Sequence, residues 1–203
     1  MKLTYCSENN NFCLKSIVSS KLTNNEIRQI CLLKDKQWKF GIKSQLKYFK
    51  NNIKKIDLHS LFYIKSKLVG YTLLRKRTSK IENLKKNIHY LLFDTLVIDK
   101  KYRGMKLSDL LMSFNNTIIK QSGFSSFLIC SNELVGFYKK NNWTKLNSKD
   151  FSVMDHSFSS NGMVFNKKKF KKKIFYYINI KGLNWTRGKA AGLTSPPSTS
   201  GMR

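Results

Sequence analysis

An apolar segment, a basic turn and an amphipathic segment, in that order, constrain the fold of this chain most. Residues 90–98 are almost uninterruptedly apolar, which is typical of a buried strand. A tight turn containing Arg103 and Gly104 follows. From Leu107 onward apolar residues recur every three or four positions, which predicts a helix that Gly123 ends. A strand, a tight turn and a helix in this order predict an α/β fold.

The turn between this strand and this helix has the properties of an anion site. A glycine turn exposes consecutive main-chain N–H groups, and the helix that follows adds its unpaired first donors and its dipole. Lys100, Lys101, Arg103 and Lys106 make the local potential more positive. A pyrophosphate suits such a site, although many strand–turn–helix units bind nothing.

Shorter segments surround this unit and complete a mixed sheet with helices. Thr23 and Glu26 have the spacing of a capping box, which predicts the start of a helix after a first strand. Two apolar runs joined by residues 65–67 predict a hairpin. The remaining expected elements are strands at 14–20, 127–130 and 162–165 and helices at 43–49 and 134–140.

The charge of the chain favours polyanionic partners. Its 203 residues include 39 Lys and Arg against 11 Asp and Glu, a formal net charge of +28. Such a surface attracts nucleic acid, anionic lipid or phosphorylated ligands. Lysine supplies most of the excess, in a sequence rich in Asn, Ile and Phe, which favours a coding bias that leaves much of the excess as solvated lysines without a partner.

The length favours one domain with an appendage. We expect a folded domain over residues 1–166, a basic and aromatic extension over 167–185, and a disordered tail over 186–203 that holds both prolines. The extension is interpreted either as a membrane or nucleic-acid patch or as a solvated exit from the last strand.

Several classes of protein are not expected. No apolar run approaches the roughly 20 residues of a membrane-spanning helix, and no secretory signal is recognisable, so a cytoplasmic location is predicted. No cysteine pair has metal-ligand spacing, and reduced thiols are expected at Cys6, Cys13, Cys31 and Cys130. The three histidines are scattered, so no metal site is predicted.

Three motifs resemble the GCN5-related N-acetyltransferase (GNAT) family over about residues 14–165. Residues 67–74, Lys-Leu-Val-Gly-Tyr-Thr-Leu-Leu, resemble its hairpin. Residues 96–104, with Ser-Asp-Leu-Leu at 108–111, resemble its acyl-CoA motif. The strand 127–130 followed by Phe-Tyr-Lys-Lys-Asn-Asn-Trp at 137–143 resembles its last conserved helix end. The resemblance implies a partly splayed, mixed β-sheet flanked by helices.

The resemblance also implies which residues would act. The acyl-CoA-binding positions, through their main chain, would be Leu96, Val97, Ile98, Arg103, Gly104, Met105, Lys106, Leu107 and Ser108. A strand N–H near Leu96 would stabilise the oxyanion. Asp94 would be the base that deprotonates the amine and Tyr138 the acid for the leaving thiolate. The alternatives are an ion pair at Asp94, a packed aromatic at Tyr138, and either a structural or an acceptor-facing role for His59.

The sequence departs from the family pattern at the turn and at the last motif. Lys106 and Ser108 stand where the family has glycine or a small residue, and Asn142 stands where it has glycine. The Lys106 side chain could help to hold phosphate or could crowd it. The departures therefore bear on how tightly the cofactor binds.

The predicted function is N-acyl transfer from acetyl-CoA, or another short acyl-CoA, to a primary amine by direct attack, with a small-molecule amine as acceptor. The alternative is a basic protein that binds polyanions or a membrane surface on a degenerate scaffold of the same type. Weak, non-specific contact with polyanions or anionic membranes is expected in either case. The acceptor and the oligomeric state are left open.

Overall fold

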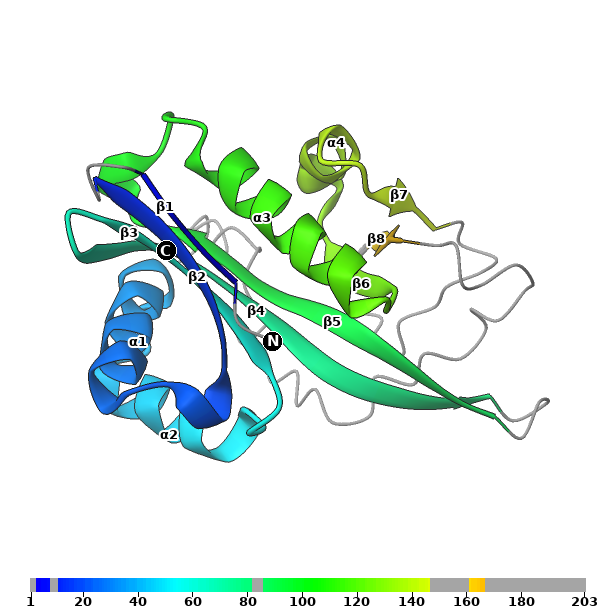
Figure 1. The fold of residues 1–203 in the computed structure, drawn as a ribbon, viewed down its shortest axis with the longest axis horizontal. Coiled ribbons are helices and arrows are strands. Elements are labelled where there is room, and N and C mark those ends of the chain that lie inside the picture. The colour runs from blue at the N-terminus through cyan, green and yellow to red at the C-terminus, as the bar shows by residue number, and fades with distance from the viewer. Residues whose placement is uncertain (1–2, 8–10, 82–85, 147–160, 167–203) are drawn as a thin grey trace, which may run out of the picture.

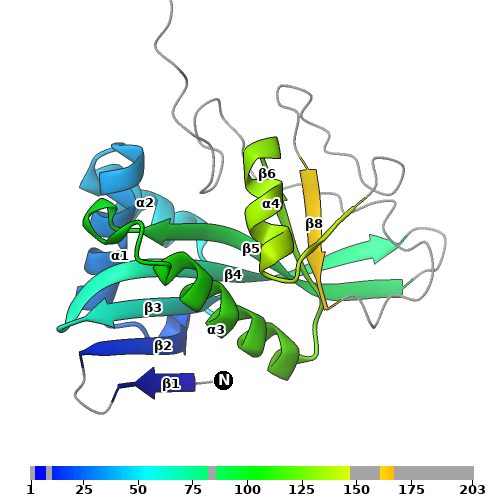
Figure 2. The ribbon, with the colours of Figure 1, turned by 90° about the horizontal axis from the view of Figure 1, so that it is seen from above.

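The fold is one open, mixed sheet with helices on both faces. The computed structural model describes residues 3–7, 11–81, 86–146 and 161–166 (Figure 1). The sheet has eight strands in the order β1-β2-β3-β4-β5-β6-β8-β7. Helices α1 and α2 cover one face, and α3 and α4 lie on the other (Figures 1 and 2). This is the predicted α/β class with a mixed sheet flanked by helices.

The elements lie where the sequence patterns predict them, but β4 and β5 extend well beyond their apolar runs at 68–74 and 90–98. The helices are α1 (Asn24–Trp38), α2 (Ile42–Asn52), α3 (Leu107–Ser122) and α4 (Asn132–Lys140). The strands are β1 (Leu3–Cys6), β2 (Phe12–Val18), β3 (Leu58–Ile64), β4 (Lys67–Ile81), β5 (Lys86–Ile98), β6 (Ser126–Cys130), β7 (Thr144–Lys145) and β8 (Asn161–Phe165). Short 3-10 turns occupy Ser19–Lys21 and Lys100–Tyr102.

Local signals start and stop the helices as predicted. The Thr23 hydroxyl accepts a hydrogen bond from the Glu26 N–H at 3.1 Å, and the Glu26 carboxylate accepts one from the Thr23 N–H at 2.8 Å, so the capping box begins α1. Gly123 takes the left-handed conformation at the end of α3, with φ of 67°. Both predictions are confirmed.

The two larger of three apolar clusters lie on opposite faces of the sheet. Beneath α3 and α4 the larger core joins apolar side chains of most strands, including Leu74, Phe93 and Leu128, to those of α3. Beneath α1 and α2 a smaller core surrounds Ile30 and Tyr71. The central strands β4 and β5 contribute to both cores, so any irregularity in them affects both faces.

Two strands were not predicted, and the disulfide state of two cysteines was predicted wrongly. β1 and β7 are short and carry no clear pattern. Cys6 and Cys13 oppose each other in the antiparallel β1–β2 ladder and form a disulfide, so the expectation of reduced thiols is wrong for this pair. Spacing along the chain does not reveal such a cross-strand neighbour. Cys31 and Cys130 are free and buried, and burial raises the pKa of both thiols to about 11.

Several expectations lie outside the described residues. They concern the extension at 167–185, the tail at 186–203 and His156. The domain boundaries therefore stay predictions. Within the described part of the chain, no helix combines the length and the apolar run that crossing a bilayer requires.

Candidate active site

The sheet opens between β5 and β6. The two strands are parallel and pair only at Leu91 with Ser126 and Leu92 with Phe127. The Leu91 N–H donates to the Ser125 carbonyl at 3.0 Å, and the Ser126 hydroxyl donates to the Leu91 carbonyl at 2.9 Å. Beyond these residues the two strands diverge. Past Leu92, the edge of β5 that faces β6 offers main-chain donors and acceptors that β6 does not use.

A β-bulge in β5 lies at the start of this opening. Leu74 of β4 pairs with Phe93, and Leu73 pairs with Thr95, so Asp94 is an extra residue in β5. Such a bulge increases the local twist and re-aims the side chains that follow it. Accordingly Phe93 and Leu96 both join the core beneath α3, although three positions separate them in the chain.

The predicted cofactor residues of β5 can act only through their main chain. The side chains of Leu96, Val97 and Ile98 are buried in the two cores. What this strand presents at its open edge is therefore N–H and C=O groups. An extended ligand could pair with them as an added strand would.

The turn after β5 is fixed by side-chain contacts on the side that faces α1. The Asp99 carboxylate accepts hydrogen bonds from the Lys36 ammonium at 2.8 Å and the Lys101 N–H at 3.1 Å. Burial by itself would raise the pKa of Asp99, but these two hydrogen bonds lower it below its ordinary value. The Arg103 side chain bonds back to the Ile98 carbonyl and to Gln37 of α1. These contacts fix the turn against α1.

The glycine of the turn is exposed, and its surroundings are empty. Gly104 has φ of +83°, and a Cβ added there would meet nothing within 4 Å. Lys106 is the N-cap of α3, also left-handed with φ of 56°. The Arg103 N–H donates to the Lys100 carbonyl, whereas no described residue accepts from the N–H groups between Gly104 and Ser108. The turn has the open donors that an anion needs.

Tyr138 projects from α4 into the core next to the opening. It is fully buried, and its ring packs edge-on against Phe93 and Trp143 at 6.4 and 6.1 Å between centroids. Burial raises its pKa well above the ordinary value. Its hydroxyl has no hydrogen-bond partner among the described residues. A buried hydroxyl without a partner is uncommon in native proteins and needs an explanation, such as a ligand.

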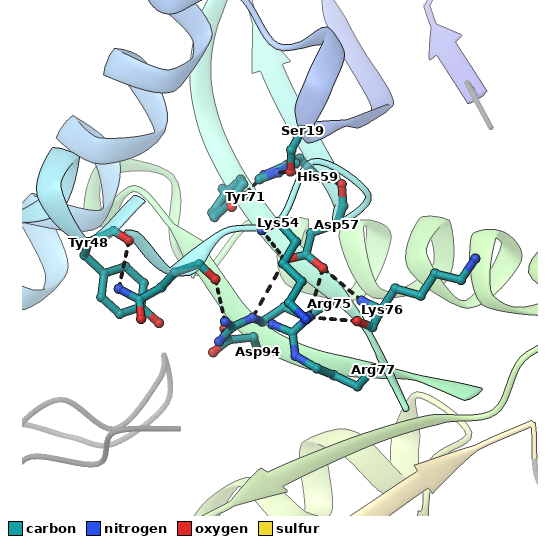
Figure 3. A network of polar contacts seen from close by, with 11 residues as sticks. Ser19, Tyr48, Lys54, Asp57, His59, Tyr71, Arg75, Lys76, Arg77 and Asp94 are labelled. Atoms are coloured by element: carbon teal, nitrogen blue, oxygen red, sulfur yellow. Dashed lines mark hydrogen bonds and ion pairs between the residues drawn. The ribbon is translucent and has the colours of Figure 1, made fainter. Parts of the chain in front are cut away.

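Asp94 lies on the opposite side of the sheet, in a network of charges (Figure 3). Its Oδ2 accepts a hydrogen bond from Arg75 at 2.9 Å, and both side chains are buried. Arg75 also donates to the Asn52 carbonyl at 2.7 Å, which ties α2 to the sheet. No described residue donates to Oδ1 of Asp94. One carboxylate oxygen is therefore engaged and the other is available.

Solved structures resemble this chain in fold. The chain superposes on Escherichia coli ElaA with a TM-score of 0.54 and 15% identity, covering 74% of this chain and 97% of that one. For an acyl-CoA N-acyltransferase from Pseudomonas aeruginosa the TM-score is 0.55 at 13% identity, with coverage of 74% and 97%. The chain has the GNAT fold.

An aminoglycoside 6'-N-acetyltransferase in complex with coenzyme A is similar to the same extent. Its TM-score is 0.55 at 10% identity, and the match covers 74% of this chain and 95% of that one. No protein-family model and no curated protein matches this sequence. At these identities the likeness concerns the fold.

The second carboxylate of the network, Asp57, holds the loop before β3. It accepts hydrogen bonds from the main-chain N–H groups of Lys54 and Lys76, at 2.9 and 3.0 Å, and from Arg77 at 3.1 Å. It also lies 3.9 Å from Arg75. Because all of its partners belong to the loop and to β4, Asp57 positions this side of the GNAT sheet.

His59 has a structural environment. It is fully buried, its Nδ1 lies 2.9 Å from the Tyr71 hydroxyl, and its Nε2 lies 2.6 Å from the Ser19 hydroxyl. Burial lowers the pKa of His59 to about 3, so the ring is neutral. The interpretation that His59 faces an acceptor is therefore wrong, because no part of the ring reaches solvent.

The structure adds residues that the sequence did not indicate. Arg75, the partner of Asp94, follows an apolar run and has no motif of its own. Lys34 of α1 places its ammonium 4.9 Å from the ring centroid of Tyr48, and burial lowers its pKa. Among the described residues, no group of three His, Cys, Asp or Glu could hold a metal ion.

Proposed function

We propose that this protein transfers an acetyl or other short acyl group from acyl-CoA to a primary amine. The observation that carries the proposal is that, in a GNAT fold, an unpaired strand edge ends at an open glycine turn. The edge of β5 is free of β6 after Leu92, and the glycine turn at its end leads directly into α3. An elongated ligand with a diphosphate fits a strand edge that ends at an anion-binding turn.

The residues present fit coenzyme A. The N–H groups between Gly104 and Ser108 would hold the pyrophosphate, and the main chain of residues 96–98 would pair with the pantetheine arm. Lys106 is exposed at the mouth of the turn, where its ammonium adds positive charge. Tyr138, whose hydroxyl has no partner among the described residues, packs edge-on against Phe93 at the start of the opening. When bound, acetyl-CoA supplies an acyl group activated as a thioester.

Each proposed catalytic group has a distinct task. Asp94 accepts the proton that the amine must lose before it can attack, through the oxygen that Arg75 does not occupy. A main-chain N–H of β5 near Leu96 stabilises the oxyanion, as hydrogen-bond donors fixed in a dry site do. Tyr138, whose raised pKa keeps it protonated, donates a proton to the departing thiolate.

The acceptor proposed is a small-molecule amine, and a cytoplasmic location stays a prediction. The alternative is a binding protein without catalysis. It was suggested by Lys106 and Ser108, which depart from the family's turn. In the structure the Lys106 side chain is exposed, and the turn is not sealed by its neighbours. The side chains at these positions therefore leave room for a ligand, which favours the enzyme.

A paired experiment tests the proposal. Acetyl-CoA at millimolar concentration should raise the melting temperature, and a panel of amines should release CoA thiol. Asp94→Asn should lower the amine-dependent rate by about 10²-fold or more, the usual contribution of a general base. Tyr138→Phe should lower the rate without destabilising the fold, because its hydroxyl has no described partner to lose.

Asp57→Asn is the matched control. It removes a second buried carboxylate from the same arginine cluster but from a position that supports the loop before β3. It should reduce stability and keep the rate per folded molecule. An unchanged melt with acetyl-CoA, together with no thiol release from any amine, would exclude the enzyme. A rate loss in Asp57→Asn equal to that in Asp94→Asn would exclude Asp94 as the base.

A further inference from the structure

Lysines on α2 form a row that no acid of the described chain neutralises. Lys43, Lys47 and Lys50 follow each other at four and three residues, which puts them on one side of the helix. All three are exposed, and Lys54 continues the row just past the helix end. The helix contains no Asp or Glu. Within the described residues none of these lysines makes an ion pair.

The row opposes the stability of its own helix. Like charges three and four residues apart repel each other along a helix face. The helix dipole disfavours Lys43 in the first turn and favours Lys50 in the last, so repulsion within the row is the main cost. A bound polyanion would relieve this repulsion, because each ammonium would then face a negative group.

The row faces away from the sheet. The apolar side of α2 packs on the smaller core through Phe49, and the chain after the helix continues this contact through Ile53. On α2 itself the exposed residues beside the lysines are polar, Ser44 and Asn51. The exposed large apolar side chains nearby in the chain, Phe40 and Ile56, lie before and after the helix. Figure 1 shows α2 with α1 in a separate layer on this face of the sheet. A ligand can therefore lie along the row without displacing any packed side chain.

The neighbouring helix also carries exposed cations. Arg28 and Lys39 of the α1 segment are exposed. Its two acids are already engaged: Glu26 pairs with Lys15 at 2.6 Å, and Asp35 accepts from the Gly41 N–H at 2.7 Å. The layer thus carries cations outward and keeps its carboxylates occupied.

We propose that the α2 lysine row, Lys43, Lys47, Lys50 and Lys54, binds the phosphate backbone of a nucleic acid. A phosphodiester chain presents regularly spaced anions, and lysines bind it by releasing its counterions. A membrane-surface helix would expose apolar residues beside its lysines, whereas the apolar side of α2 is covered by the sheet. This binding is separate from acyl transfer and does not require it.

The test measures the binding of the full chain to a labelled, mixed-sequence oligonucleotide of about 20 nucleotides across a salt series. The variant is Lys43→Gln with Lys47→Gln and Lys50→Gln, because glutamine keeps the helix and removes only charge. The control makes the same change at three exposed lysines elsewhere, Lys21, Lys139 and Lys145. Both sets leave the glycine turn untouched and lower the net charge equally.

We expect the α2 variant to reduce the slope of log K against log[salt] by roughly 2, and to weaken binding about tenfold or more at low salt. The control should change the slope much less, and arginines at the three α2 positions should restore it. Equal losses in variant and control would overturn the proposal, since binding would then follow total charge. No binding at low salt, or an effect of the α2 variant on anionic vesicles alone, would also overturn it.

Discussion

At the scale of single residues, His59 shows how one side chain joins three elements. Its ring stacks between Phe49 of α2 and Tyr71 of β4, at 5.6 and 5.8 Å between centroids. One direction of hydrogen bonding satisfies every donor: Tyr71 donates to Nδ1, Nε2–H donates to Ser19, and Ser19 donates to the Asp57 carbonyl. This assignment leaves no site on the ring for an added proton, so His59 is neutral in the fold.

The neutral His59 predicts a loss of stability in mild acid. Its pKa is about 3 in the fold against an ordinary value of 6.5, so protonation favours the unfolded chain. The contribution is complete above pH 6.5 and is lost as the pH falls towards 3. The free energy of unfolding should fall by about 2 kcal/mol between about pH 7 and pH 5, as measured by urea denaturation.

The carboxylates do not interfere in this pH range. Glu26, whose pKa is lowered from an ordinary 4.5 because the hydrogen bonds from Lys15 and Thr23 outweigh burial, affects stability only below that pH. His59→Gln should be less stable at neutral pH and should show a flatter dependence between about pH 7 and pH 5. If the free energy of unfolding of this variant fell between about pH 7 and pH 5 as steeply as that of the unchanged protein, a group other than His59 would cause the effect.

Two of the three departures from the family pattern have one backbone explanation. Lys106 and Asn142 both have positive φ, 56° and 66°, where the family has glycine. Asparagine tolerates this conformation well, whereas lysine is strained in it. The sequence comparison located both positions, but only the backbone shows that they share a left-handed conformation. Both positions therefore keep the left-handed backbone conformation without glycine.

At the scale of elements, Gly70 sets how closely α3 approaches the sheet. A Cβ at this residue of β4 would lie 2.8 Å from Cδ1 of Ile98, 3.2 Å from Cβ of Phe62 and 3.3 Å from Cδ2 of Leu111. Gly70→Ala should therefore lower the free energy of unfolding by about 1–3 kcal/mol, through overpacking. The melting temperature should fall by roughly 3 to 8 °C.

Gly136 provides the matched control for this prediction. It lies within α4, and a Cβ there would meet nothing within 4 Å. Gly136→Ala should raise stability by about 0.5–1 kcal/mol, because alanine loses less backbone entropy in a helix. If Gly70→Ala raised the melting temperature as Gly136→Ala should, the interface between α3 and the sheet would be looser than the distances indicate.

Sequence patterns predicted the elements that have strong periodicity or caps. The capping box of α1, the glycine end of α3 and the apolar run of β5 are all local signals. The bulge at Asp94 and its ion pair with Arg75 were not predictable, because both depend on how β4 and β5 align over nineteen residues. The sequence therefore predicts the fold better than it predicts the contacts of the candidate site. The assigned catalytic roles stay predictions.

At the scale of the whole molecule, most of the described carboxylates already form ion pairs. In the described part, Glu26, Asp57, Asp94, Asp99 and Asp109 each lie within ion-pair distance of a cation. With 39 basic residues against 11 acidic ones, most cations have no counter-charge. Net repulsion among them destabilises the compact state, and the few ion pairs offset only part of it.

This balance predicts that simple salt stabilises the fold. Raising NaCl from about 20 to 300 mM shortens the screening length from roughly 20 to 6 Å, which weakens repulsion between distant lysines more than attraction within close pairs. The melting temperature should rise by a few degrees, on the order of 1 kcal/mol. The triple Lys→Gln variant of α2 should melt higher at low salt and gain less from NaCl, because it has less repulsion to screen. A melting temperature that falls with NaCl would instead mean that the ion pairs around Arg75 and Asp99 dominate the electrostatics of the whole fold.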